Sequence, residues 1–198
     1  LAITTLTLTV LLLAGCGGPP PSRAPGVYML LDPSGPYTEE IDKARQIINF
    51  TLTRLEPGDS FAVARIDTAS FSEKDIVAKA TFDDRPSTAN GQKRQFQTEV
   101  SEFVSRVRPS AYTDISGGLL QALEYLEEKD PGRRTIFIFS DLKEDLEEGY
   151  IRDFPLTFAD VDVVALNVTK LRSDNVDPRE YLDRLAAWQQ RVEQGGGR

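Results

Sequence analysis

Short, mostly apolar runs alternate with longer amphipathic stretches over most of the chain. The apolar runs have the length and the β-branched and aromatic content of strands, and they cover residues 27–31, 61–66, 76–82, 135–139 and 161–168. The amphipathic stretches carry apolar residues three or four positions apart, which predicts helices over residues 38–55, 92–107 and 115–128 and from Pro178 onward. Strands that alternate with helices in this way predict an α/β fold, in which helices cover both faces of a mostly parallel central sheet.

One strand of this sheet is expected to run against the others. Residues 67–75 separate the second predicted strand from the third, and this link is too short for the helix that a parallel connection needs. We therefore predict that the strand over residues 76–82 lies antiparallel at one edge of the sheet. The polar residues 83–91 are expected to form a loop, residues 26–194 the folded domain, and the glycine-rich residues 195–198 a disordered tail.

The N-terminal segment differs from the rest of the chain. Residues 1–14 are uncharged and strongly apolar, but they are fewer than the roughly 20 residues that cross a membrane core, so they suit the apolar region of an export signal. The segment closes with the sequence Leu-Ala-Gly-Cys, ending at Cys16, which resembles the lipobox of bacterial lipoproteins. The resemblance implies that residues 1–15 are a lipoprotein signal peptide and that Cys16 carries diacylglycerol and fatty acyl chains such as palmitate.

The residues around and after this cysteine predict a tether and a location. Residues 16–25 are rich in glycine and proline and predict a flexible link between the lipidated cysteine and the domain. Gly17 stands where lipoproteins retained in an inner membrane often carry an acidic residue. We therefore expect the protein in the bacterial cell envelope, anchored by lipid, and at the outer membrane facing the periplasm rather than at the inner membrane.

The residue inventory narrows the chemistry that the domain can perform. The chain of 198 residues has 31 acidic and 23 basic residues, a formal net charge of -8. This balance argues against a nucleic-acid partner, which needs a basic surface, and leaves the lipid as the expected membrane contact. The chain has no histidine and one cysteine, which excludes imidazole-based catalysis, imidazole-based zinc sites and an internal disulfide.

Polar residues collect where the predicted strands end. Asp32 and Ser34 follow the first strand, Thr113 precedes the helix over residues 115–128, and Asp141 follows the strand over residues 135–139. In open α/β sheets, ligands bind beyond the carboxyl ends of the strands. Because carboxylates and hydroxyls are hard oxygen donors, these residues suit Mg²⁺ or Mn²⁺ and not zinc.

This set of residues, in this order, resembles the von Willebrand factor A domain. That family has a metal-ion-dependent adhesion site with an Asp-x-Ser-x-Ser loop after the first strand, a threonine in a later loop and an aspartate after the fourth strand. Asp32 and Ser34 match the loop, Thr113 the threonine and Asp141 the last aspartate. The resemblance covers about residues 26–168. It implies a three-layer Rossmann-like fold, a Mg²⁺ or Mn²⁺ ion on these four residues, and a non-catalytic module that binds a protein partner through an acidic side chain.

The sequence departs from the family at one ligand position. Pro36 stands where the family has its second serine, and proline offers neither a hydroxyl nor an amide donor. Two outcomes therefore stay open. Water occupies that position, which magnesium tolerates. Alternatively, the site is vestigial, and the edge of the sheet where these residues collect, here called the rim, binds its partner by shape alone. Asp114, Ser140 and Thr38 are expected beside the ligands, with Thr38 at the start of the first helix.

Two other interpretations stay open. Asp32 and Asp114 also suit helix caps or turns. An aspartate after the first strand also occurs in enzymes that form an aspartyl-phosphate, so the alternative function is an aspartate-based phosphotransfer or phosphatase enzyme on a related fold. The match is poor, because Ser34 stands where haloacid dehalogenases have a second aspartate, and Leu30 and Leu31 stand where response-regulator receivers have acidic residues. We therefore expect no catalysis.

Overall fold

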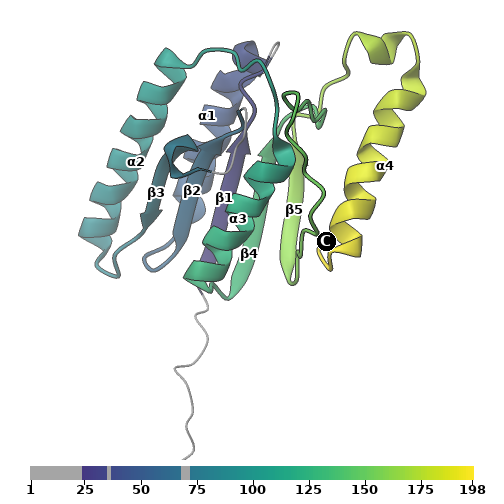
Figure 1. The fold of residues 1–198 in the computed structure, drawn as a ribbon. Coiled ribbons are helices and arrows are strands. Elements are labelled where there is room, and N and C mark those ends of the chain that lie inside the picture. Colours follow the sequence, from purple (N-terminus) through teal and green to yellow (C-terminus); the bar gives the residue numbers. More distant parts are fainter. Residues whose placement is uncertain (1–23, 35–36, 68–71) are drawn as a thin grey trace, which may run out of the picture.

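The computed structural model describes residues 24–34, 37–67 and 72–198 (Figure 1). The predicted signal peptide, residues 1–15, and the predicted lipid-attachment residue Cys16 lie outside the described residues. Among the helices of the described ranges, none combines the length and the apolar character that crossing a membrane requires.

The described residues form one five-stranded sheet. Its strands are β1 (Pro25–Leu31), β2 (Ser60–Arg65), β3 (Ile76–Thr81), β4 (Arg133–Phe139) and β5 (Val161–Leu166), in the spatial order β3-β2-β1-β4-β5. β1 pairs in parallel with β2 and β4, β4 pairs in parallel with β5, and β3 alone runs antiparallel, at the edge beside β2. The prediction of a mostly parallel sheet with one antiparallel edge strand is confirmed.

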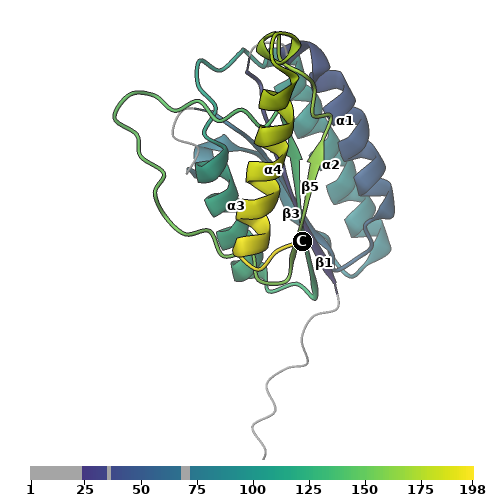
Figure 2. The same ribbon diagram turned by 90° about the vertical axis from the view of Figure 1, so that its right-hand side faces the viewer.

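Helices cover both faces of the sheet, as Figure 2 shows edge-on. The helices α1 (Tyr37–Arg54) and α2 (Pro86–Arg106) lie on one face, and α3 (Ile115–Lys129) and α4 (Pro178–Gln194) lie on the other. The buried residues of β1 alternate between two apolar clusters: Met29 and Leu31 pack with α1 and α2, and Tyr28 and Leu30 pack with α3. The predicted three-layer α/β fold, with helices on both faces of a mostly parallel sheet, is therefore confirmed.

The second helix begins earlier than the sequence pattern predicted. Residues 83–91 were expected to form a loop, but α2 starts at Pro86, which occupies its first turn, where the missing N–H of proline costs no hydrogen bond. The preceding turn is held by Asp83, whose carboxylate accepts from the Arg85 amide and whose own N–H donates to Gln92. The first turns of the helix are polar and mostly exposed and bury only Ala89, which is why they carried no clear helical periodicity.

The last residues also differ from the prediction, because residues 195–198 are docked rather than disordered. The backbone N–H of Arg198 donates to the Val161 carbonyl at 3.1 Å, and the Arg198 carbonyl accepts from the Val163 N–H at 2.8 Å. Gly195 accepts a further hydrogen bond from the Phe158 N–H. An edge strand presents unpaired backbone groups, and here β5 binds the chain terminus through them.

The α1 and α2 side of the core yields a stability prediction. Phe96 is buried and stacks on Phe61 with ring centroids 4.9 Å apart, whereas Phe50 on α1 is 58% exposed. We expect Phe96→Ala to lower the free energy of unfolding by about 3–5 kcal/mol through lost burial and a cavity. Phe50→Ala, the matched control, should cost under about 1 kcal/mol. Urea denaturation measures both, and equal losses would show that this cluster is not the core.

Candidate functional site

Asp32 is held at the carboxyl end of β1 by its neighbours in the sheet. β1 and β4 run side by side in parallel with Leu31 opposite Phe139, so Asp32 and Ser140 leave the sheet at the same end. The Ser140 hydroxyl donates to Asp32 Oδ2 at 2.7 Å, and the Ser34 amide donates to Asp32 Oδ1 at 2.8 Å. Asp32 is fully buried, and hydrogen bonds to both of its oxygens orient the carboxylate.

Asp141 is the second buried carboxylate of this rim. It is 5% exposed, and its Oδ1 accepts from the Lys143 amide at 2.8 Å. Burial raises the pKa of Asp141, the negative charge of Asp32 raises it further, and the Lys143 amide and the Arg184 charge oppose this rise. The two carboxylates therefore lie close enough at one rim for the charge of Asp32 to disfavour the ionised form of Asp141.

The third segment of the rim carries Thr113, which is 4% exposed. Its backbone pairs with Asp145, N–H to carbonyl in both directions, at 2.7 and 3.0 Å. The Ser110 amide of the same segment donates to the Pro33 carbonyl at 3.4 Å. The structure thus joins the three predicted loops at one rim: Asp32, Ser34 and Asp141 are linked there by hydrogen bonds and charge, and Thr113 is placed there by its backbone.

The residues expected beside the ligands take different positions. Ser140 contacts Asp32 directly, as described above. Asp114 begins α3 by accepting from the Gly117 amide at 2.8 Å, and both of its oxygens also bind the Arg152 guanidinium at 2.5–3.0 Å. Asp114 is therefore engaged as a helix cap and ion-pair partner. Thr38 lies in the first turn of α1, as expected, but its side chain is outside the described part.

Three residues that the sequence pattern did not predict contact the residues of this rim from other segments of the chain. Arg152 binds Asp114, and this interaction raises the pKa of the Arg152 guanidinium. Glu144 accepts from the Ser116 amide at 2.6 Å at the start of α3. Arg184 on α4 donates to the backbone of Asp141. Each partner is separated from its target by 28 or more residues, so no local pattern signalled these contacts.

The donor set fits a hard divalent cation. Two carboxylates and two hydroxyl residues supply oxygen donors only, and Mg²⁺ is commonly bound through one or two carboxylates while it keeps several waters. Within the described residues, no group of three or more acidic, cysteine or histidine side chains forms a metal cluster, so the candidate site depends on Asp32 and Asp141 as its charged members. A cation between these two would neutralise the repulsion that raises the pKa of Asp141.

Comparisons with known proteins give distant structural similarities. No family model and no curated protein sequence matches the chain. Among solved structures, it is similar to a von Willebrand factor type A protein from Catenulispora acidiphila (16% identity, 61% of this chain and 26% of that chain, TM-score 0.42). It is also similar to the pilus adhesin SpaC from Lactobacillus rhamnosus GG (13% identity, 61% of this chain and 15% of that chain, TM-score 0.42). A third similar structure is the type V pili tip protein Mfa5 from Porphyromonas gingivalis (13% identity, 69% of this chain and 23% of that chain, TM-score 0.43). The chain spans about a quarter or less of each of these three proteins.

The raised pKa of Asp141 predicts that replacing it with the neutral isostere asparagine increases the free energy of unfolding in a pH-dependent way. An acid whose folded-state pKa lies above its ordinary value of 3.8 stabilises the fold when protonated and loses that contribution as pH rises through the folded-state pKa. Asp141→Asn keeps the acceptor for the Lys143 amide and removes the charge. In cation-free buffer we expect the variant to be more stable than the parent at pH 7.

The difference should vanish as the pH falls below 3.8, where Asp141 is protonated in both states. Urea unfolding across pH 3.5–7.5 measures it, where a tenfold change in folding equilibrium corresponds to about 1.4 kcal/mol. Asp42→Asn, at an exposed position of α1, is the matched control. A variant that is less stable than the parent at pH 7 would show that the Asp141 charge is already compensated.

Proposed function

We propose that this chain is a lipid-anchored bacterial envelope protein whose domain binds a protein partner through a divalent cation. Asp32, Ser34, Thr113 and Asp141 would hold the ion, and an acidic side chain of the partner would complete its coordination. The observation that carries the proposal is the juxtaposition of two buried carboxylates, Asp32 and Asp141, at the rim where three loops meet.

The charge of this rim supports a cation. Burying like charges near each other is unfavourable unless a positive charge compensates them. The guanidinium groups nearby are matched to other acids: Arg152 pairs with Asp114, and Arg184 pairs with Asp174. Mg²⁺ or Mn²⁺ would supply the missing charge, and water would occupy the ligand position that Pro36 cannot fill.

The geometry favours binding over catalysis. Both oxygens of Asp32 already accept hydrogen bonds, from Ser34 and Ser140, which lowers the availability of this carboxylate as a nucleophile. The sequence has no histidine to act as a general base. The module therefore recognises a partner and leaves it chemically unchanged.

The direction of β1 suits an anchored adhesion module. Cys16 lies nine residues before Pro25, where β1 begins, and Asp32 follows the other end of this seven-residue strand. A strand of this length spans about 23 Å, so a lipid on Cys16 would hold one end of the sheet near the membrane and present the rim at the opposite end. With Gly17 after the lipidated cysteine, the outer membrane facing the periplasm is the proposed location.

Cation binding is tested by calorimetric titration of the chain from Arg23 onward with Mg²⁺ and Mn²⁺. We expect saturable binding and a rise in the unfolding temperature, because a ligand of the folded state stabilises it. Asp32→Ala should weaken binding at least about tenfold through loss of a ligand. Asp42→Ala, exposed on α1, should leave it unchanged. Absence of both heat and thermal shift in the parent protein would refute the cation site.

The anchor is tested separately by labelling with radioactive palmitate in a bacterium that expresses the chain with its own leader. Because Cys16 is the only cysteine, thioether lipidation has one attachment residue, and Cys16→Ser should abolish the label and release the protein from the membrane fraction. Asp32→Ala, altered only at the rim, should remain labelled. Membrane retention of unlabelled Cys16→Ser protein would contradict the lipid anchor.

A further inference from the structure

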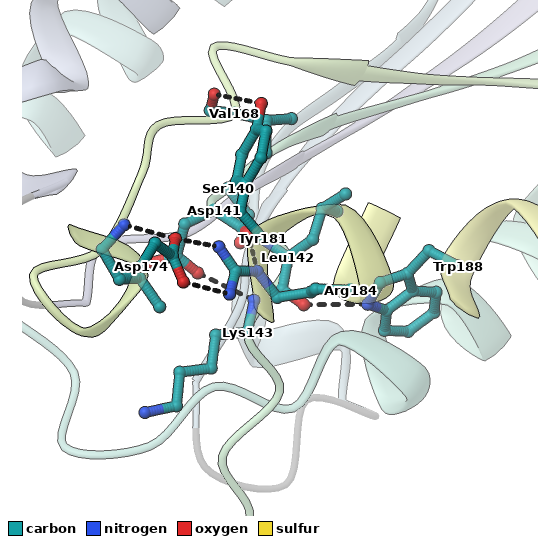
Figure 3. A network of polar contacts seen from close by, with 10 residues as sticks. Ser140, Asp141, Leu142, Lys143, Val168, Asp174, Tyr181, Arg184 and Trp188 are labelled. Carbon is teal, nitrogen blue, oxygen red and sulfur yellow. Dashed lines mark hydrogen bonds and ion pairs between the residues drawn. The ribbon is translucent and has the colours of Figure 1, made fainter. Parts of the chain in front are cut away.

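The loop that follows β4 is held in place from α4, as Figure 3 shows. The Arg184 side chain donates through Nε to the Asp141 carbonyl at 2.9 Å, and the Trp188 indole donates to the Leu142 carbonyl at 2.8 Å. Leu142 has a φ of +65°, a left-handed conformation that is uncommon for a residue with a branched side chain. Two hydrogen bonds from one helix thus fix two successive peptide groups of the Asp141 turn.

Arg184 is itself fixed by a buried acid. Its guanidinium forms a bidentate ion pair with Asp174, with Nη1 3.2 Å from Oδ1 and Nη2 2.8 Å from Oδ2. The guanidinium carbon lies 5.7 Å from the centre of the Tyr181 ring. Asp174 is 1% exposed and also accepts from the Leu171 amide at 2.7 Å, and the contact with Arg184 lowers the pKa of Asp174.

We propose that Arg184 is a positioning residue for the cation site, an inference that rests on the proposed function. The Asp141 carbonyl is held by Arg184 and its Oδ1 by the Lys143 amide, so the backbone and the carboxylate of Asp141 keep one orientation. Ion binding needs ligands in a defined geometry. Arg184 therefore affects how tightly the site binds the ion, although it contacts Asp141 only at the backbone carbonyl.

The role of Arg184 depends on its shape as well as its charge. A guanidinium is planar and presents several donors in a fixed arrangement, so one group reaches both the Asp141 carbonyl and the two oxygens of Asp174. A lysine ammonium keeps the positive charge but has no such fork. Arg184→Lys therefore removes the positioning contact with little change in the field at Asp141.

The experiment compares Arg184→Lys with the parent chain by Mn²⁺ titration and by hydrogen exchange without cation. We expect about tenfold weaker Mn²⁺ binding, the size typical of losing an outer partner of a ligand, and faster exchange of the Leu142 and Lys143 amides. Arg179→Lys is the matched control, because Arg179 lies on the same helix in an exposed ion pair with Asp177. It should change neither quantity.

A second variant covers the case in which Arg184→Lys does not fold. Asp174→Asn keeps Arg184 but weakens its anchor, and it should lower Mn²⁺ affinity a few-fold and loosen the same amides. A parent protein that binds no Mn²⁺ overturns the proposed function, and this inference with it. A parent that binds Mn²⁺ with the same affinity as the folded variants overturns the inference alone.

Discussion

The main constraint on this structure is that two acidic side chains, Asp32 and Asp141, are buried where parallel strands end. Pairing of β1 with β4 brings Asp32 beside Ser140 and Asp141, and both acids are buried at this end of the sheet. Buried carboxylates require hydrogen bonds or positive charge. Asp32 and Asp141 have hydrogen bonds from Ser34, Ser140 and Lys143, but the charge of Asp32 still raises the pKa of Asp141.

Two other buried acids near the rim, Asp114 and Asp174, differ from Asp32 and Asp141 in their partners. Asp114 and Asp174 each have a guanidinium partner, Arg152 and Arg184, so their charges are paired within the fold. Breaking such a buried pair on one side is usually costly, because it leaves an uncompensated charge. The contrast between the paired acids and the Asp32–Asp141 pair distinguishes the structural carboxylates of this rim from those proposed to bind an ion.

The sequence allowed us to predict the sheet and the residues that follow its strands at the rim. It did not allow us to predict the long-range contacts that hold those residues. Apolar runs predicted all five strands, and the short link before Ile76 predicted the antiparallel edge, since both depend on local spacing. The start of α2 at Pro86 was missed because its first turns are mostly exposed, and the docked Arg198 because its partners are backbone groups of a distant strand. Arg152 and Arg184 act across 38 and 43 residues, a separation at which only the folded chain identifies the partner.

In the proposed function, a lipid anchor holds one end of β1 and a bound ion lies at the other, and partner binding depends on the ion. The most direct measurement is anomalous diffraction from crystals soaked in Mn²⁺, which locates the metal independently of any binding assay. We expect one strong peak within coordination distance, about 2.0–2.4 Å, of oxygens from Asp32 or Asp141 and from Ser34 or Thr113. A rim without a peak, while crystals still diffract and Mn²⁺ is in excess, would contradict it.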